Sequence, residues 1–264
     1  MTLIRGKSRR GGYTQLVESG RHGLEYIGLG LLSLGDGQVW ETKFQGQEAV
    51  IVVLGGQCDV SSGGTTWDGL GQREDVFDGP PTSVYFPPES ECHVVGRGPV
   101  CAAVCTALAE RGPAPTVISP DDVVSREVGR SSFQRTVRTI VSADSLPAQR
   151  ILVGETLNPP GRWSSFPPHK HDCHRPPEES KLEEVYYYRV RPKQGFGFQR
   201  VYGDGLDETY AIQDGDSVAI SHGYHPVAAA PGYELYYLWV LAGEERVMRP
   251  CEDPNHAWVG AQDG

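Results

Sequence analysis

The segment Phe166-Pro-Pro-His-Lys-His-Asp172, which a short loop separates from Leu182-Glu-Glu-Val-Tyr-Tyr-Tyr-Arg189, decides the fold of this chain. The aromatic run of the second segment is a good strand former. In the first segment His169 and His171 stand two residues apart, so both imidazoles lie on one face of a strand, because strand side chains alternate with a period of two. Such a pair predicts a metal-binding position on a β-rich scaffold.

Two further candidate ligands extend the pair. Glu184 opens the second β-rich run, and His225 lies just beyond an expected strand at residues 216–221. Three neutral imidazoles and one carboxylate suit a divalent first-row metal ion and leave coordination positions for water or substrate. The pattern predicts a catalytic metal site, with zinc, manganese, iron and nickel as alternatives for the ion.

The composition limits the classes of partner. The chain has 264 residues and a formal net charge of −10, which argues against nucleic acid or an anionic membrane surface as the main partner, since both attract a basic face. A small anionic substrate remains compatible with this charge where a few arginines converge. The sequence leaves open whether the chain forms a homo-oligomer.

Segments that would direct the chain to or across a membrane are not expected. Residues 1–10 are basic but lead into no apolar run, and the longest apolar run, Leu235 to Ala242, is too short to span a bilayer. The six cysteines form no CxxC pair, which favours unpaired thiols in a reducing compartment. We therefore expect a soluble cytoplasmic protein.

Short strands separated by Gly and Asp turns fill the chain, and helix-forming runs are scarce. This spacing favours a β-barrel or sandwich. The strands fall into two sets, one ending near Leu108 and one starting at Gln149. The mixed segment between them contains Ser119-Pro-Asp-Asp122, which predicts a single helical turn.

The two sets of strands read as an internal repeat. Glu48 and the apolar residues after it match Glu184 and the strand that it opens. In the first copy the positions facing the histidine pair hold Glu41 and Lys43, and the position facing His225 holds Glu91. We therefore expect the first copy to bind no metal ion.

Four longer motifs occur in order along the second half: Trp163-Ser-Ser-Phe-Pro-Pro-His-Lys-His-Asp172, Leu182-Glu-Glu-Val-Tyr-Tyr-Tyr-Arg189, Gly195-Phe-Gly-Phe-Gln-Arg-Val-Tyr202 and Gly223-Tyr-His-Pro-Val-Ala-Ala-Ala-Pro-Gly232. Together they resemble the 5-deoxy-glucuronate isomerase family of bacterial inositol catabolism, which is related to the uronate ketol-isomerases of pectin breakdown. The resemblance implies an all-β fold of two cupin (double-stranded β-helix or jelly-roll) barrels in one chain. The implied domains are an N-terminal cupin without metal ligands over 1–110, a connector over 111–147 and a metal-binding C-terminal cupin over 148–264.

The family's metal ligands fall on His169, His171, Glu184 and His225. Glu183 competes with Glu184 for the carboxylate position, and we prefer Glu184 because it abuts the apolar strand as Glu48 does in the first copy. The loop 172–183 is longer than cupins usually allow, so it reads as an insertion that could cover the site. The roles of this loop and of His222 stay open.

Candidates for proton transfer and substrate binding surround the expected ligands. The catalytic candidates are Glu183, Tyr186 and Lys170, although Lys170 cannot act as a base while it is charged, and a tyrosinate or a hydroxide on the metal are alternatives. A guanidinium matches a carboxylate in geometry, and Arg200 is our first choice of substrate clamp. The other substrate-binding candidates are Arg189, Arg162 and Tyr188.

The main functional hypothesis is a metal-dependent aldose–ketose isomerase that converts 5-deoxy-D-glucuronate to 5-dehydro-2-deoxy-D-gluconate. The substrate comes from the resemblance, and the metal-assisted chemistry comes from the residues. An Fe(II) cupin dioxygenase is an alternative, since its ligand set can be identical. A non-catalytic sugar-acid-binding cupin ranks last, because no DNA-binding segment supports a sensor.

Overall fold

A computed structural model describes residues 2–6 and 11–261 of the chain. Strands are the main regular elements of the described residues, which confirms the expected all-β class; the helices are α1 (Trp258–Ala261) and the 3₁₀ turns η1 (Pro120–Asp122) and η2 (Ser131–Phe133). Turn η1 is the helical turn expected at Ser119, and the Asp122 carboxylate accepts hydrogen bonds from the Ser119 backbone N–H and hydroxyl at 2.9 and 2.6 Å. No helix in the described residues is long and apolar enough to cross a membrane.

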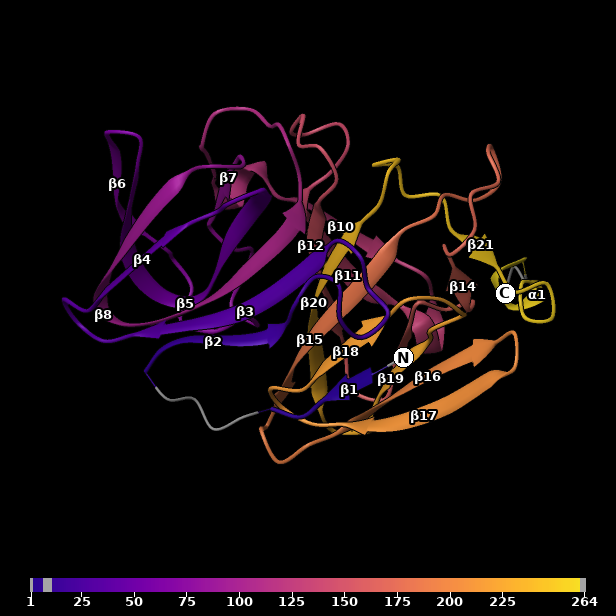
Figure 1. The fold of residues 1–264 in the computed structure, drawn as a ribbon. Coiled ribbons are helices and arrows are strands. Elements are labelled where there is room, and N and C mark those ends of the chain that lie inside the picture. The colour runs from indigo at the N-terminus through magenta and orange to yellow at the C-terminus, as the bar shows by residue number, and fades with distance from the viewer. Residues whose placement is uncertain (1, 7–10, 262–264) are drawn as a thin grey trace.

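The first half of the chain builds one antiparallel sheet in the order β2-β3-β8-β5-β7-β9, with β4 added on β8 and β6 on β5 (Figure 1). Its strands are β2 (Gly12–Val17), β3 (Ile27–Leu34), β4 (Val39–Lys43), β5 (Gln47–Ser62), β6 (Thr65–Leu70), β7 (Ser83–Phe86), β8 (Glu91–Leu108) and β9 (Thr116–Ile118). The long strands β5 and β8 shift register around Gly55, where they bend. Gly56 has φ +87°, and a Cβ there would lie 2.2 Å from the Pro99 carbonyl oxygen, so the bend requires glycine.

The second half contains a seven-stranded sheet in the order β1-β18-β15-β20-β12-β11-β10, a four-stranded sheet β13-β19-β16-β17 and the pair β14-β21. Its strands are β10 (Val124–Val128), β11 (Arg135–Val141), β12 (Leu152–Asn158), β13 (Trp163–Ser164), β14 (His169–Lys170), β15 (Glu183–Arg191), β16 (Gly197–Gly203), β17 (Leu206–Ile212), β18 (Ser217–Ile220), β19 (Val227–Ala229), β20 (Glu234–Ala242) and β21 (Cys251–Glu252).

Two segments join sheets other than those expected from their positions in the sequence. Strand β1 (Thr2–Ile4), at the amino terminus, pairs with β18 in the second half, with Thr2 opposite Ala219 (Figure 1). The segment 111–147, expected as a connector, carries β9 on the first sheet and β10 and β11 on the second. Both halves therefore use strands from outside the boundaries that the sequence suggests.

Apolar side chains form one cluster inside the first half, two inside the second and a larger one between the halves. Strand β15 contributes to both sides of its sheet because its side chains alternate. Val185 and Tyr187 lie in the cluster between the halves, whereas Tyr186 and Tyr188 lie in the cluster inside the second half. Even-numbered residues of β15 therefore face the interior of the second half.

Two carboxylates make matching contacts across the boundary between the halves. Glu48 accepts hydrogen bonds from the backbone N–H groups of residues 149–151 at 2.6–2.8 Å. Glu183 accepts hydrogen bonds from the N–H groups of residues 25–27 at 2.6–2.7 Å. The repeat partner of Glu48 is therefore Glu183, and the expected match between Glu48 and Glu184 was wrong by one residue, which moves a side chain to the other face of a strand.

Candidate metal centre and cavity

Three histidine rings meet inside the second half. His169 comes from β14 and His171 follows it, while His225 follows a turn after β18; one ring nitrogen of each lies within 4.8 Å of those of the other two. Glu184, on the inward face of β15, places Oε2 3.2 Å from Nε2 of His171 and 3.3 Å from Nε2 of His225. The structure thus brings together all four residues that the sequence nominated as metal ligands.

Backbone carbonyls orient two of the rings. Nδ1 of His171 lies 2.8 Å from the Leu182 carbonyl oxygen, and Nδ1 of His225 lies 2.8 Å from that of Gly223. Each Nδ1 donates its proton to that carbonyl, so each Nε2 presents a lone pair to the centre. Nε2 of His225 is buried without a hydrogen-bond partner, although Glu184 is close. This unsatisfied nitrogen, together with the donor set, fits a divalent metal ion.

The charges of the centre also suit a cation. Burial opposes ionisation of Glu184, yet the hydrogen bond from His171 and the charges of His171 and His225 lower its pKa to about 2. Burial, with the charges of His225 and His171, lowers the pKa of His169 well below its usual value. Burial also disfavours a charged His171, but the hydrogen bond that it donates to Glu184, and the charge of that carboxylate, raise its pKa. A cation that binds here therefore takes the place of any proton on Nε2 of His171.

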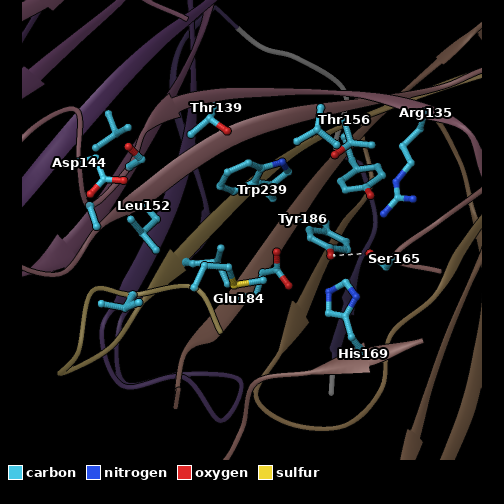
Figure 2. Close-up of a pocket in the computed structure, with 18 residues that line it drawn as sticks. Arg135, Thr139, Asp144, Leu152, Thr156, Ser165, His169, Glu184, Tyr186 and Trp239 are labelled. Atoms are coloured by element: carbon cyan, nitrogen blue, oxygen red, sulfur yellow. Dashed lines mark hydrogen bonds between the residues drawn. The ribbon is translucent and has the colours of Figure 1, made fainter. Parts of the chain in front are cut away.

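A cavity of about 500 Å³ opens beside this centre. Figure 2 shows His169 and Glu184 at its floor, Arg135 and Tyr186 on one side and Asp144 with Leu152 at the other end. The hydroxyls of Tyr186 and Ser165 lie 3.2 Å apart on its wall. A ligand in the cavity would therefore contact the candidate metal centre and several polar side chains at once.

Of the three catalytic candidates, the structure brings only Tyr186 to the cavity. Burial raises the pKa of Glu183, but its carboxylate faces the first half and binds the backbone there. Lys170 points away from His169, as strand alternation requires, and its Nζ lies 2.5 Å from Asp172 and 3.8 Å from Glu179. These carboxylates outweigh the effect of burial and raise its pKa, so it stays charged.

The four substrate-binding candidates do not line the cavity. Arg200 is exposed, forms a two-point ion pair with Asp207 at 2.8 and 2.9 Å and stacks on the Tyr202 ring. The others also have partners elsewhere: Arg189 with Asp214, Arg162 with Gln134 and the buried Tyr188 with Gln199.

The sequence reading did not nominate Arg135, although this residue lines the cavity. Arg135 opens β11, inside the segment expected as a connector. The alternate residues Arg135, Val137, Thr139 and Val141 all line the cavity, so one face of the strand forms its wall. The alternating segment Arg135-Thr-Val-Arg-Thr-Ile-Val141 was the available signal.

Comparison with known sequences gives a family match over most of the chain. Residues 2–259 match the KduI/IolB family. Proteins named 5-deoxy-glucuronate isomerase are similar: that of Geobacillus thermodenitrificans is 41% identical over 240 residues, covering 90% of this chain and 87% of the relative. That of Listeria monocytogenes is 38% identical over 253 residues, covering 94% and 93%.

Comparison with solved structures supports the fold. An IolB-like protein from Salmonella typhimurium is similar with a TM-score of 0.94 and 35% identity, covering 98% of this chain and 100% of that one. The oxalate decarboxylase of Lactobacillus farciminis has a TM-score of 0.69 at 13% identity, covering 98% and 88%. This second likeness shows the cupin-like fold alone.

Proposed function

This chain belongs to the KduI/IolB family, and we propose on that basis that it isomerises 5-deoxy-D-glucuronate to 5-dehydro-2-deoxy-D-gluconate in myo-inositol catabolism. The observation that carries the proposal is the cluster of three histidines and Glu184, of which His169 and Glu184 lie at the floor of a cavity. The names of relatives that are 36–42% identical support the substrate.

The proposed metal ligands are His169, His171, Glu184 and His225. A divalent ion held there, with zinc, manganese, iron and nickel as the alternatives, would polarise the substrate carbonyl and stabilise the negative charge that develops on proton removal. The protein supplies neutral nitrogens and one carboxylate, and the cavity beside them has room for a small molecule. The carbonyl end of the substrate therefore lies at the floor of the cavity.

We assign Tyr186 the role of hydrogen-bond donor to a substrate oxygen. Burial, and then the charge of Glu184, raise its pKa well above the usual value. The group therefore stays a phenol at neutral pH and can donate a proton or a hydrogen bond but cannot act as a base. The hydroxyl of Ser165, 3.2 Å away, supports its orientation.

The proposal extends to the architecture and the compartment. Each half is one cupin unit, and only the second binds a metal ion; the matching contacts of Glu48 and Glu183 support this duplication. The strand pairing favours units over 12–118 and 124–261, the second completed by β1. The six cysteines form no disulfide bond, which supports a reducing cytoplasm.

The test is anaerobic incubation of metal-analysed protein with 5-deoxy-D-glucuronate, followed by NMR of the product. The proposal expects the ketose to form without oxygen and expects chelation of the metal to stop its formation. Turnover that requires oxygen and Fe(II) would instead indicate a dioxygenase, and the absence of any turnover in the metal-loaded protein would contradict the proposal.

A further inference from the structure

The guanidinium of Arg135 is largely buried and has no acidic partner. Its Nη1 donates to the carbonyl oxygens of Phe133 and Phe166 at 3.2 and 3.4 Å. In residues 2–6 and 11–261, no carboxylate lies within ion-pair distance, and Nε and Nη2 have no acceptor. Burial lowers the pKa of Arg135. Burying a cation without an anion costs free energy unless a ligand supplies the anion.

Other buried arginines of this chain are satisfied by the protein itself. Arg73 forms a two-point ion pair with Glu155 at 2.5 and 3.0 Å. Arg189 pairs with Asp214, and Arg246 donates through all three of its nitrogens to backbone carbonyls. Arg135 differs from these because its unused donors line a cavity.

The surroundings of Arg135 connect it to the candidate metal centre. Figure 2 shows the guanidinium directed into the cavity toward Ser165 and Tyr186, with His169 on the floor below. Arg135 and His169 both line this cavity, so the two groups face the same space. One small molecule could therefore contact the metal centre with one end and Arg135 with the other.

We propose that Arg135 binds the carboxylate of the sugar-acid substrate, with Nε and Nη2 donating to its two oxygens. A guanidinium matches a carboxylate in this planar, two-point arrangement, and a site that excludes water strengthens the pair. The inference rests on the proposed function for the identity of the acid. It makes Arg135, in place of Arg200, the residue that selects an acid over a neutral sugar.

The test uses a ligand that cannot isomerise. Borohydride reduction of 5-deoxy-D-glucuronate removes the aldehyde and keeps the carboxylate, and the primary amide of that product is its neutral match. Calorimetry on the metal-loaded protein measures the affinity for each compound. We expect the parent to bind the acid more tightly than the amide, and Arg135→Gln to lose about 10- to 150-fold in affinity for the acid, as expected for a charge-assisted pair, with little change for the amide.

Two variants serve as controls. Arg200→Gln removes an exposed guanidinium outside the cavity and should keep the preference of the parent. Arg135→Lys keeps the charge but loses the planar fork, so it should lose about tenfold in affinity for the acid even if Arg135→Gln folds poorly. Metal content and melting temperature identify folded, loaded samples.

A parent protein without preference for the acid, an Arg135→Lys variant with parental affinity, or a preference that depends on Arg200 would overturn the assignment. The outcome is separable from that of the proposed function. Failure of the parent to isomerise 5-deoxy-D-glucuronate would reject the reaction and leave the acid-over-amide preference as a measure of Arg135 alone.

Discussion

At His171 the two ring nitrogens have different tasks, since Nδ1 donates to the Leu182 carbonyl and Nε2 faces Glu184. His171→Ala should lower metal content and activity at least tenfold, while the fold persists because the apolar clusters stabilise it. Elemental analysis, activity and circular dichroism measure these effects. The matched control is His222→Ala at an exposed histidine, which should retain its metal. A His171→Ala protein that is unfolded at room temperature would show that the ion holds the fold.

Tyr186→Phe removes only the hydroxyl from the cavity wall. Because that hydroxyl is the proposed donor to a developing negative charge, kcat should fall about 100-fold with metal content unchanged. Tyr188→Phe is the control, since its hydroxyl is bonded to Gln199 in the core and does not reach the cavity. Steady-state kinetics that show an equal loss in both variants would reject the role of Tyr186.

The nature of single side chains predicted the metal cluster but not the carboxylate clamp. The spacing of two histidines two residues apart, followed by a glutamate at the start of a strand, is enough to place both rings on one strand face. A lone arginine carries none, because its role depends on which acids lie near it. Arg200 lies on β16, the strand that follows the one carrying Glu184, yet in the folded chain it forms an ion pair with Asp207. Arg135 lies farther away along the chain but reaches the cavity.

At the scale of the element, the alternation of β15 separates two adjacent glutamates. Glu183→Gln should lower the free energy of unfolding by about 2–3 kcal/mol, because the charged acceptor of three backbone N–H groups is lost, and the melting temperature by about 4–12 °C. Metal content should stay at the parental level. Glu184→Gln should do the reverse: it should lose metal with a smaller change in melting temperature. Thermal melts and elemental analysis of both variants measure these effects. Equal metal loss in both variants would contradict the assignment of Glu183 and Glu184 to opposite faces of β15.

Strands were predictable as elements, but several of their partners were not. The pattern of residues 135–141 indicates a strand, yet only the folded chain shows that it joins β12 and lines the cavity. The same holds for β1, whose partner is distant in sequence. Propensity and periodicity are local, whereas strand pairing depends on the packing of the whole sheet. The match of Glu48 to Glu184 in place of Glu183 was wrong for the same reason, because the sequence pattern alone does not show which residues make equivalent contacts.

At the scale of the molecule, the two halves predict one metal ion per chain. In the first half, Glu41 lies 3.2 Å from His93, and Lys43 lies 3.0 Å from Glu89, all on the surface. The described residues of that half hold no cluster of three histidines or acids of the kind found in the second. Elemental analysis of purified protein should give one divalent ion per chain, and two tightly bound ions would contradict this count.

The position of β1 bears on how the chain is made. Residues 2–4 are synthesised before their partners at 217–219, which follow about 210 residues later. At typical rates of synthesis this interval lasts roughly 10–40 s. During that time the first half can assemble its own sheet, while the amino-terminal strand waits unpaired. Translation therefore sets an order in which the half that carries the histidines is completed after the first half, by a strand that was synthesised long before its partner.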